Sequence, residues 1–127
     1  MSTFVYDTAV LIAADRNEKR TWIDHSNRLD EGSLVLVPAP VVAQVSRSAR
    51  QVQLRRFLVG CTIVPFGEQD AHEAGQLLRV ARTSDIVDAS VVTLAIRHIP
   101  AAIVTSDKAD IGRLVIASGQ KVAIEDV

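Results

Sequence analysis

Several aspartates of this chain stand beside apolar runs. Asp7 and Asp107 each follow a short apolar run, and Asp85 and Asp88 begin a third segment that is otherwise almost entirely apolar. Because a carboxylate is costly to remove from water, a chain rarely places several of them against a core without a charge that neutralises them. A hard divalent cation, which prefers oxygen ligands, is the natural partner for such a group. The spacing therefore suggests one acidic, metal-binding pocket.

The same aspartates also stand where helix caps are expected. Asp85 and Asp88 are three residues apart, as are Asp107 and Asp110, and this is the spacing of an N-cap and the third helical residue. Acids in a first helical turn are favoured by free N–H groups and by the helix dipole. Capping alone explains Asp7 less well, since it directly follows a buried strand, and Asp88 less well, since its neighbours are apolar. Both interpretations stay open for the single residues.

Basic and polar residues near these acids supply further candidates. Four arginines gather in a short segment: Arg47, Arg50, Arg55 and Arg56. They indicate either a local phosphate-binding patch or a solvated helix surface. Arg79 and Arg82 precede the acidic turn and are further candidates for contacts with a nucleic-acid backbone. Thr105 and Ser106 are candidates for orienting carboxylates or water. The histidines, His25, His72 and His98, lack the spacing of metal ligands, and we expect them at the surface or at helix ends.

The elements that must position these residues alternate along the chain. Apolar runs predict strands at residues 3–6, 34–37, 61–64, 101–105 and 121–124. Helical spacing of apolar residues predicts helices at residues 8–14, 17–30, 40–49, 51–59, 68–81, 85–97 and 108–117. Such alternation implies right-handed crossovers and a mostly parallel central sheet in a three-layer α/β/α sandwich. Ligands of these folds bind beyond the carboxyl ends of the strands, which is where Asp7 and Asp107 fall.

Composition narrows the class of protein. The chain has 127 residues, and we expect a single domain over residues 1–127. Its net charge of −1 gives no overall attraction to nucleic acid or membrane, so a polyanion would need a local patch. Its single cysteine, Cys61, excludes an internal disulfide and a zinc site with several thiolates. The longest apolar window, residues 34–45, contains two prolines and is too short to span a bilayer.

Four blocks of the sequence resemble, in order and spacing, those of PIN-domain proteins, above all the small VapC-type toxins: residues 5–8, 40–47, 85–95 and 104–110. The resemblance covers essentially the whole chain and implies a metal-dependent endoribonuclease. It implies that Asp7, Asp88 and Asp107 are the catalytic acids, that Asp85 joins them as a ligand of Mg²⁺ or Mn²⁺, and that Asp110 is accessory. It also implies an RNA substrate, a cognate antitoxin and a homodimer. From the basic segments we expect Arg47, Arg50 and Arg82 to contact that RNA, and the single cysteine suits a cytoplasmic location away from membranes.

One residue departs from the family pattern. Gln44 stands where the family usually has a glutamate. An amide oxygen can coordinate a metal or orient a water molecule, but it brings no negative charge. Two functions therefore remain open, a working nuclease with a weakened metal site and a catalytically silent module that binds RNA or a partner protein. A phospho-acceptor signalling domain fits less well, because it needs paired acids after the first strand and a lysine after a late strand, where this chain has Asp107.

Overall fold

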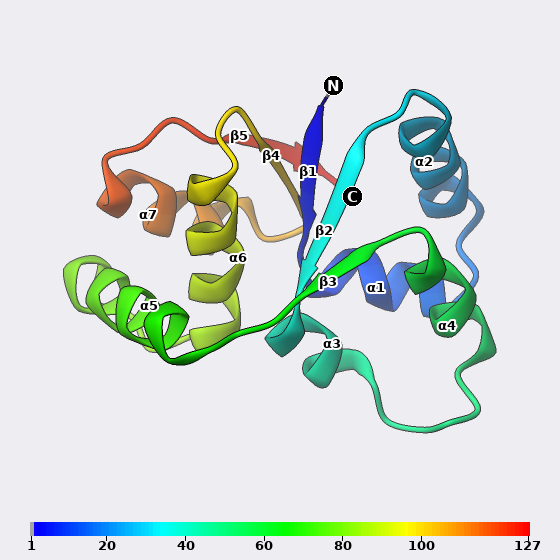
Figure 1. Ribbon diagram of the computed structural model, residues 1–127, viewed down its shortest axis with the longest axis horizontal. Coiled ribbons are helices and arrows are strands. Elements are labelled where there is room, and N and C mark those ends of the chain that lie inside the picture. Colours follow the sequence, from blue (N-terminus) through cyan, green and yellow to red (C-terminus); the bar gives the residue numbers. More distant parts are fainter. Residues whose placement is uncertain (1) are drawn as a thin grey trace.

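The computed structural model describes residues 2–127, which form a five-stranded sheet between two groups of helices (Figure 1). The strands are arranged in the order β3-β2-β1-β4-β5, and all four pairings are parallel. The predicted sheet, expected to be mostly parallel, is therefore parallel throughout. The strands are β1 (Thr3–Tyr6), β2 (Leu34–Pro38), β3 (Thr62–Val64), β4 (Ala102–Thr105) and β5 (Ala123–Asp126).

Seven helices complete the three layers. In Figure 1 the helices α1, α2 and α4 lie on one side of the sheet, and α5, α6 and α7 lie on the other. Helix α3 lies beyond the carboxyl end of β2 and contacts both α1 and α6, so it links the two groups. The predicted α/β/α sandwich is confirmed. The helices are α1 (Thr8–Asp15), α2 (Lys19–Asp30), α3 (Ala39–Val45), α4 (Val52–Val59), α5 (Glu68–Ala81), α6 (Ile86–Arg97) and α7 (Lys108–Ser118).

Helix α6 is the most deeply placed helix. Every residue from Asp88 to Ala95 is buried, because α6 packs against β1, β2 and β4 on one side and against α5 and α7 on the other. This confirms the prediction of a buried helix that begins with acids. No helix within the described residues is long and apolar enough to cross a membrane.

A small aromatic cluster holds the helices of the opposite layer to the sheet. Phe57 of α4 stacks on Tyr6 of β1 with ring centres 5.8 Å apart, and Trp22 of α2 meets Phe57 edge-on at 5.1 Å. The Tyr6 hydroxyl lies 2.8 Å from Nδ1 of His25, and Arg28 donates a hydrogen bond to the same hydroxyl. His25 is 3 % exposed, so the expectation of a surface or helix-end position is wrong for this histidine. Burial lowers the pKa of His25 below its usual value, which keeps the ring neutral.

Several boundaries differ from the prediction by one or more residues, and two of these differences have a clear physical cause. The helix expected over residues 40–49 ends at Val45, because the side chain of Gln51 accepts the N–H groups of Arg47 and Ser48 that a longer helix would have used. The last strand runs over residues 123–126 instead of 121–124. It is an edge strand with little burial, so its register follows its pairing with β4 and not its own apolar pattern.

Candidate functional site

A cavity of about 310 Å³ opens where the carboxyl ends of β1 and β4 meet the first residues of α1, α6 and α7. It contains five residues that the sequence proposed as a shared site: Asp7, Gln44, Asp85, Asp88 and Asp107. The remaining lining residues are Thr8, Ala9, Ile12, Val87 and Ser106. Residues from four separate parts of the chain thus converge at the edge where ligands of parallel sheets bind.

Asp7 is fixed more tightly than any other acid of the cavity. It is 4 % exposed, and its Oδ1 accepts the N–H of Thr8 at 2.7 Å while its Oδ2 accepts the hydroxyl of Thr105 at 2.6 Å. The Thr105 hydroxyl also accepts the N–H of Asp107 at 2.9 Å. One buried hydroxyl therefore positions both Asp7 and Asp107. This bears out the expectation that Thr105 orients a carboxylate.

The capping interpretation and the shared-pocket interpretation both apply to the same residues. Asp85 is the N-cap of α6 and accepts the N–H of Asp88 at 3.0 Å, and Asp107 is the N-cap of α7 and accepts the N–H of Asp110 at 3.1 Å. In each case the capping bond uses a single oxygen, Oδ1. Capping therefore orients these carboxylates at the cavity.

Three of the acids form a compact group. Each of Asp88, Asp107 and Asp110 offers a carboxylate oxygen, and these three atoms lie within 4.8 Å of one another. Asp88 is only 9 % exposed, and burial raises the pKa of its carboxyl to about 7, with further contributions from the charges of its neighbours: Asp7, Asp85, Asp107 and Asp110. Asp110 does not line the cavity and joins the group from its rim.

The donor set fits a hard divalent cation. The residues that line the cavity include no lysine and no arginine, so among the described residues no basic side chain at the cavity wall neutralises the carboxylates. The donors are carboxylate, amide and hydroxyl oxygens, which Mg²⁺ and Mn²⁺ prefer. The pKa of Asp88 is raised mainly by burial and further by the repulsion of the neighbouring carboxylates.

Gln44 lies on α3, is exposed, and lines the cavity together with the acids. Thr8 and Ile12, which line the cavity from the first two turns of α1, were not among the residues predicted from the sequence to form the site. The only signal for them is their position one and five residues after Asp7, on the helix that Asp7 caps.

The arginines expected at the substrate lie outside the cavity. Arg47, Arg50 and Arg82 are exposed and none of them lines it. The guanidinium of Arg47 folds back on the end of α3 and donates to the carbonyl oxygens of Ala43 and Ser46 at 2.8 and 3.0 Å. Arg82 caps the end of α5 with φ of +58°. Arg50 and Arg82 are therefore exposed outside the cavity, and Arg47 is already paired with backbone carbonyl oxygens.

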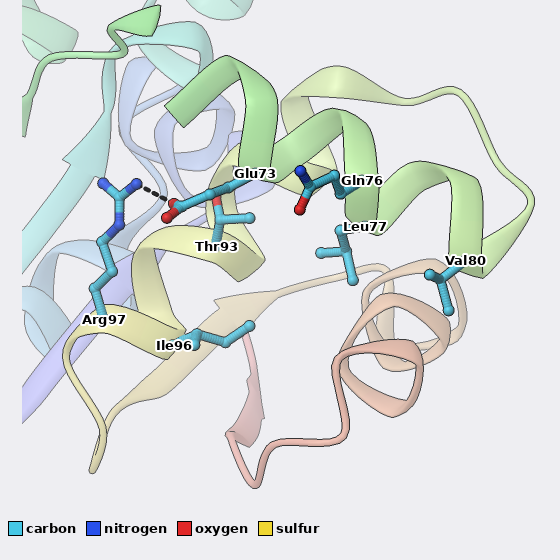
Figure 2. A pocket seen from close by; sticks show the side chains of 7 residues that line it. All are labelled: Glu73, Gln76, Leu77, Val80, Thr93, Ile96 and Arg97. Carbon is cyan, nitrogen blue, oxygen red and sulfur yellow. Dashed lines mark hydrogen bonds and ion pairs between the residues drawn. The ribbon is translucent and has the colours of Figure 1, made fainter. Parts of the chain in front are cut away.

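A second cavity of about 300 Å³ lies between α5 and α6 (Figure 2). Leu77, Val80 and Ile96 give it an apolar floor, and Arg97 closes one end through an ion pair with Glu73. It has a single carboxylate, which is already paired with a guanidinium. This cavity therefore lacks the unpaired acids that would suit it to metal chemistry.

Comparisons with known proteins agree with this fold. Among solved structures, a chain of VapBC2 from Rickettsia felis, solved bound to a DNA fragment from their promoter, superposes with a TM-score of 0.73 at 18% identity, covering 98% of each chain. A chain of FitAcB from Neisseria gonorrhoeae superposes with a TM-score of 0.61 at 18% identity, covering 96% of each chain. A search of curated proteins found no match. The family model of the PIN domain matches residues 4–114. The chain therefore belongs to the PIN domain family.

Proposed function

We propose that this protein is a Mg²⁺- or Mn²⁺-dependent endoribonuclease that hydrolyses RNA phosphodiesters. The observation that carries the proposal is the convergence of Asp7, Asp88 and Asp107 on one cavity without a basic counterion, at the carboxyl edge of the sheet. Membership of the PIN domain family supports nuclease activity, because PIN domains are generally nucleases. The choice of RNA and of the metal belongs to the proposal.

Each residue has a role that its position supports. Asp7, Asp88 and Asp107 would hold the divalent cation, with Asp85 as a further ligand and Asp110 as an accessory acid at the rim. When bound, the cation would polarise the scissile phosphate and acidify an attacking water molecule. Thr105 keeps Asp7 and Asp107 in one arrangement through two hydrogen bonds, so little reorganisation is needed when the cation enters. The amide of Gln44, which lines the cavity, would orient water there.

Gln44 also supports a second candidate function. It is a neutral amide at the position where the family usually has a glutamate. The cavity therefore has one negative charge fewer than that of a family member with the glutamate, and should hold a divalent cation more weakly. In that case the protein is a weakened or inactive PIN module that binds RNA or a partner protein. Metal affinity and cleavage measured together separate the two functions.

The biological setting is proposed from resemblance. Blocks of the sequence resemble the VapC-type toxins, and one structural neighbour is named VapBC2. We therefore place the protein as the toxin of a toxin–antitoxin pair, with a cognate antitoxin, a homodimeric state and a cytoplasmic location. Arg47, Arg50 and Arg82 would contact RNA beyond the cleaved bond.

The test combines RNA cleavage with metal binding. Purified protein should cleave a labelled single-stranded RNA with Mg²⁺ or Mn²⁺ and not in EDTA, and the metal should raise the melting temperature. Asp7→Asn with Asp107→Asn should abolish the metal-dependent rise and reduce cleavage at least ~100-fold, since even residues that only orient ligands contribute about 10–100-fold. Asp30→Asn, at an exposed acid of α2, is the matched control and should change neither quantity. Equal metal stabilisation of the wild type and the double variant would contradict a shared metal pocket.

A further inference from the structure

The acidic cavity is charged mainly on one side. The starts of α6 and α7 contribute three of its acids: Asp85, Asp88 and Asp107. Helix α1 contributes only uncharged side chains to the cavity: Thr8, Ala9 and Ile12. Asp7 ends β1 in the sheet between these helices. Because α1 lies on one side of the sheet and α6 and α7 on the other (Figure 1), the cavity has an acidic side and a neutral side.

Ile12 is an exposed apolar residue on the neutral side. It is 37% exposed, whereas the residues around it in α1 are buried: Val10, Leu11, Ala13 and Ala14. A single exposed isoleucine is common on protein surfaces and needs no function. Ile12 differs because it lines a cavity of acids, where an aliphatic side chain contributes nothing to metal binding. Its buried neighbours hold this part of α1 against the core, so the position of Ile12 is fixed.

The side chain of Thr8 is free to bind a ligand. Thr8 stands one helical turn before Ile12, on the same face of α1. Its backbone N–H donates to Oδ1 of Asp7, but its hydroxyl makes no hydrogen bond within residues 2–127. No fully buried side-chain oxygen or nitrogen of the described residues lacks a partner, so this hydroxyl is open to water in the cavity. It can both donate and accept a hydrogen bond.

Hydrogen-bond donors are scarce in the cavity. Ionised carboxylates only accept hydrogen bonds. Among the lining side chains the donors are the hydroxyls of Thr8 and Ser106 and the amide of Gln44. Ser106 adjoins Asp107 on the acidic side, whereas Thr8 shares its helix face with Ile12. The neutral side thus combines a free hydroxyl with an aliphatic contact, which suits a sugar that has hydroxyl groups and C–H groups.

The neutral side is already formed in the free protein. The Gln51 amide donates to Asp15 at the end of α1 and to the carbonyl oxygen of Val45 at the end of α3. These two bonds tie together the helices that carry Ile12 and Gln44. A ligand that enters between them would therefore spend little free energy on ordering the site.

We propose that Thr8 and Ile12 bind the ribose next to the scissile phosphate and select RNA over DNA. The phosphate lies at the acidic side, the Ile12 side chain packs against the C–H groups of the sugar, and the Thr8 hydroxyl bonds to the 2′-hydroxyl group. DNA lacks this group, so the second contact distinguishes the two nucleic acids. The Ile12 contact is independent of the base. The inference rests on the proposed function, because it names the residues that make RNA its substrate.

The test compares two labelled tetranucleotide probes that differ only in the 2′-hydroxyl groups. Both have random base sequence with uracil in place of thymine. Binding is measured by anisotropy in Ca²⁺, which takes the same oxygen ligands as Mg²⁺, and gel electrophoresis checks that the probes stay intact. The variants are Thr8→Val, which removes the hydroxyl and keeps the shape, and Ile12→Ala. The controls are Thr62→Val on β3 and Ile23→Ala on α2, both at exposed residues outside the cavity.

The wild type should bind the ribose probe more tightly than the deoxyribose probe. Thr8→Val should weaken binding of the ribose probe by up to ~10-fold, the value of one hydrogen bond, and leave the deoxyribose probe unaffected. Ile12→Ala should weaken both probes equally, by about 10-fold, because it removes an apolar contact that both sugars make. Both controls should behave as the wild type. Circular dichroism checks that each variant is folded.

Three results would overturn the inference. They are equal affinity of the wild type for both probes, equal weakening of both probes by Thr8→Val, and no effect of Ile12→Ala on either probe. Cleavage of a longer RNA by the same samples in Mg²⁺ or Mn²⁺ tests the nuclease separately. Cleavage together with any of these three results removes only the ribose site. A ribose preference that Thr8→Val abolishes, without cleavage by the wild type, removes only the nuclease.

Discussion

Replacing Asp88 with asparagine should stabilise the metal-free protein. Burial and the charges of the other acids raise the pKa of Asp88 from 3.8 to about 7. Because this folded-state pKa lies above the unfolded value, the native state disfavours the ionised carboxylate. The free energy of unfolding therefore falls as the pH rises from 3.8 towards 7, and the whole loss is present above pH 7. Asparagine has nearly the same shape and no charge, so it avoids this loss.

The size of the effect follows from the shift in pKa. A difference of about three units corresponds to about 4 kcal/mol at roughly 1.4 kcal/mol per unit. The carboxylate borders an open cavity, where water screens the repulsion, so we expect about 2 kcal/mol at pH 8. Near pH 4 the carboxyl of the folded wild type is protonated, and the difference between the two proteins should vanish.

The assay is urea unfolding in EDTA at both pH values, followed by the fluorescence of Trp22, which packs edge-on against Phe57. Glu18→Gln is the control, since Glu18 is exposed and makes no side-chain capping bond. Saturating Mg²⁺ should reverse the order, because a cation at ~100 times its dissociation constant adds about 2.7 kcal/mol to a protein that binds it. A gain of equal size at both pH values, or no gain at pH 8, would refute the reasoning.

Three further predictions concern single residues. Gln44→Glu should lower the Mg²⁺ concentration at half-maximal stabilisation, measured by thermal shift, whereas no change would mean that the Gln44 side chain does not meet the cation. Thr105→Val should cost about 2 kcal/mol in urea unfolding and weaken metal binding, because it removes the hydroxyl that Asp7 and Asp107 share, and Thr105→Ser should restore both. The lowered pKa of His25 stabilises the protein above pH 6.5, and this stability should be lost as the pH falls through the folded-state pKa. His25→Asn should flatten the unfolding free energy between pH 6.5 and 5, and an unchanged slope would contradict the assignment.

Much of the site was predictable because strand ends and helix starts are visible in sequence. Asp7 and Asp107 follow apolar runs, and a parallel sheet brings the ends of such runs to one edge. Asp85 and Asp88 were predictable because capping and burial both place them at the start of α6. The parallel pairing of the strands follows from the same alternation of runs.

The end of α3, the burial of His25 and the position of β5 were not predicted from the sequence, because they depend on contacts between distant segments. The loop after α3 is set by the side chain of Gln51, which reaches Asp15 thirty-six residues away. His25 is buried because Tyr6 and Phe57 surround it, and neither is near it in sequence. The position of β5 is set by its neighbour in the sheet. Such contacts leave no periodic signal in the chain, so sequence patterns do not reveal them.

The hydrogen bond between Thr105 and Asp7 joins residues 98 positions apart, across the pairing of β1 with β4. During synthesis β1 emerges before β4, and residues 7–101 are made between them. Pairings over such a separation form late and slowly. A nascent chain that ends before β4 therefore has Asp7 and Asp88 but lacks the strand that brings Asp107 to them. If this protein cleaves RNA, this order of synthesis protects the message and the ribosome that produce it, because the cleaving centre does not exist until β4 and the start of α7 have been made.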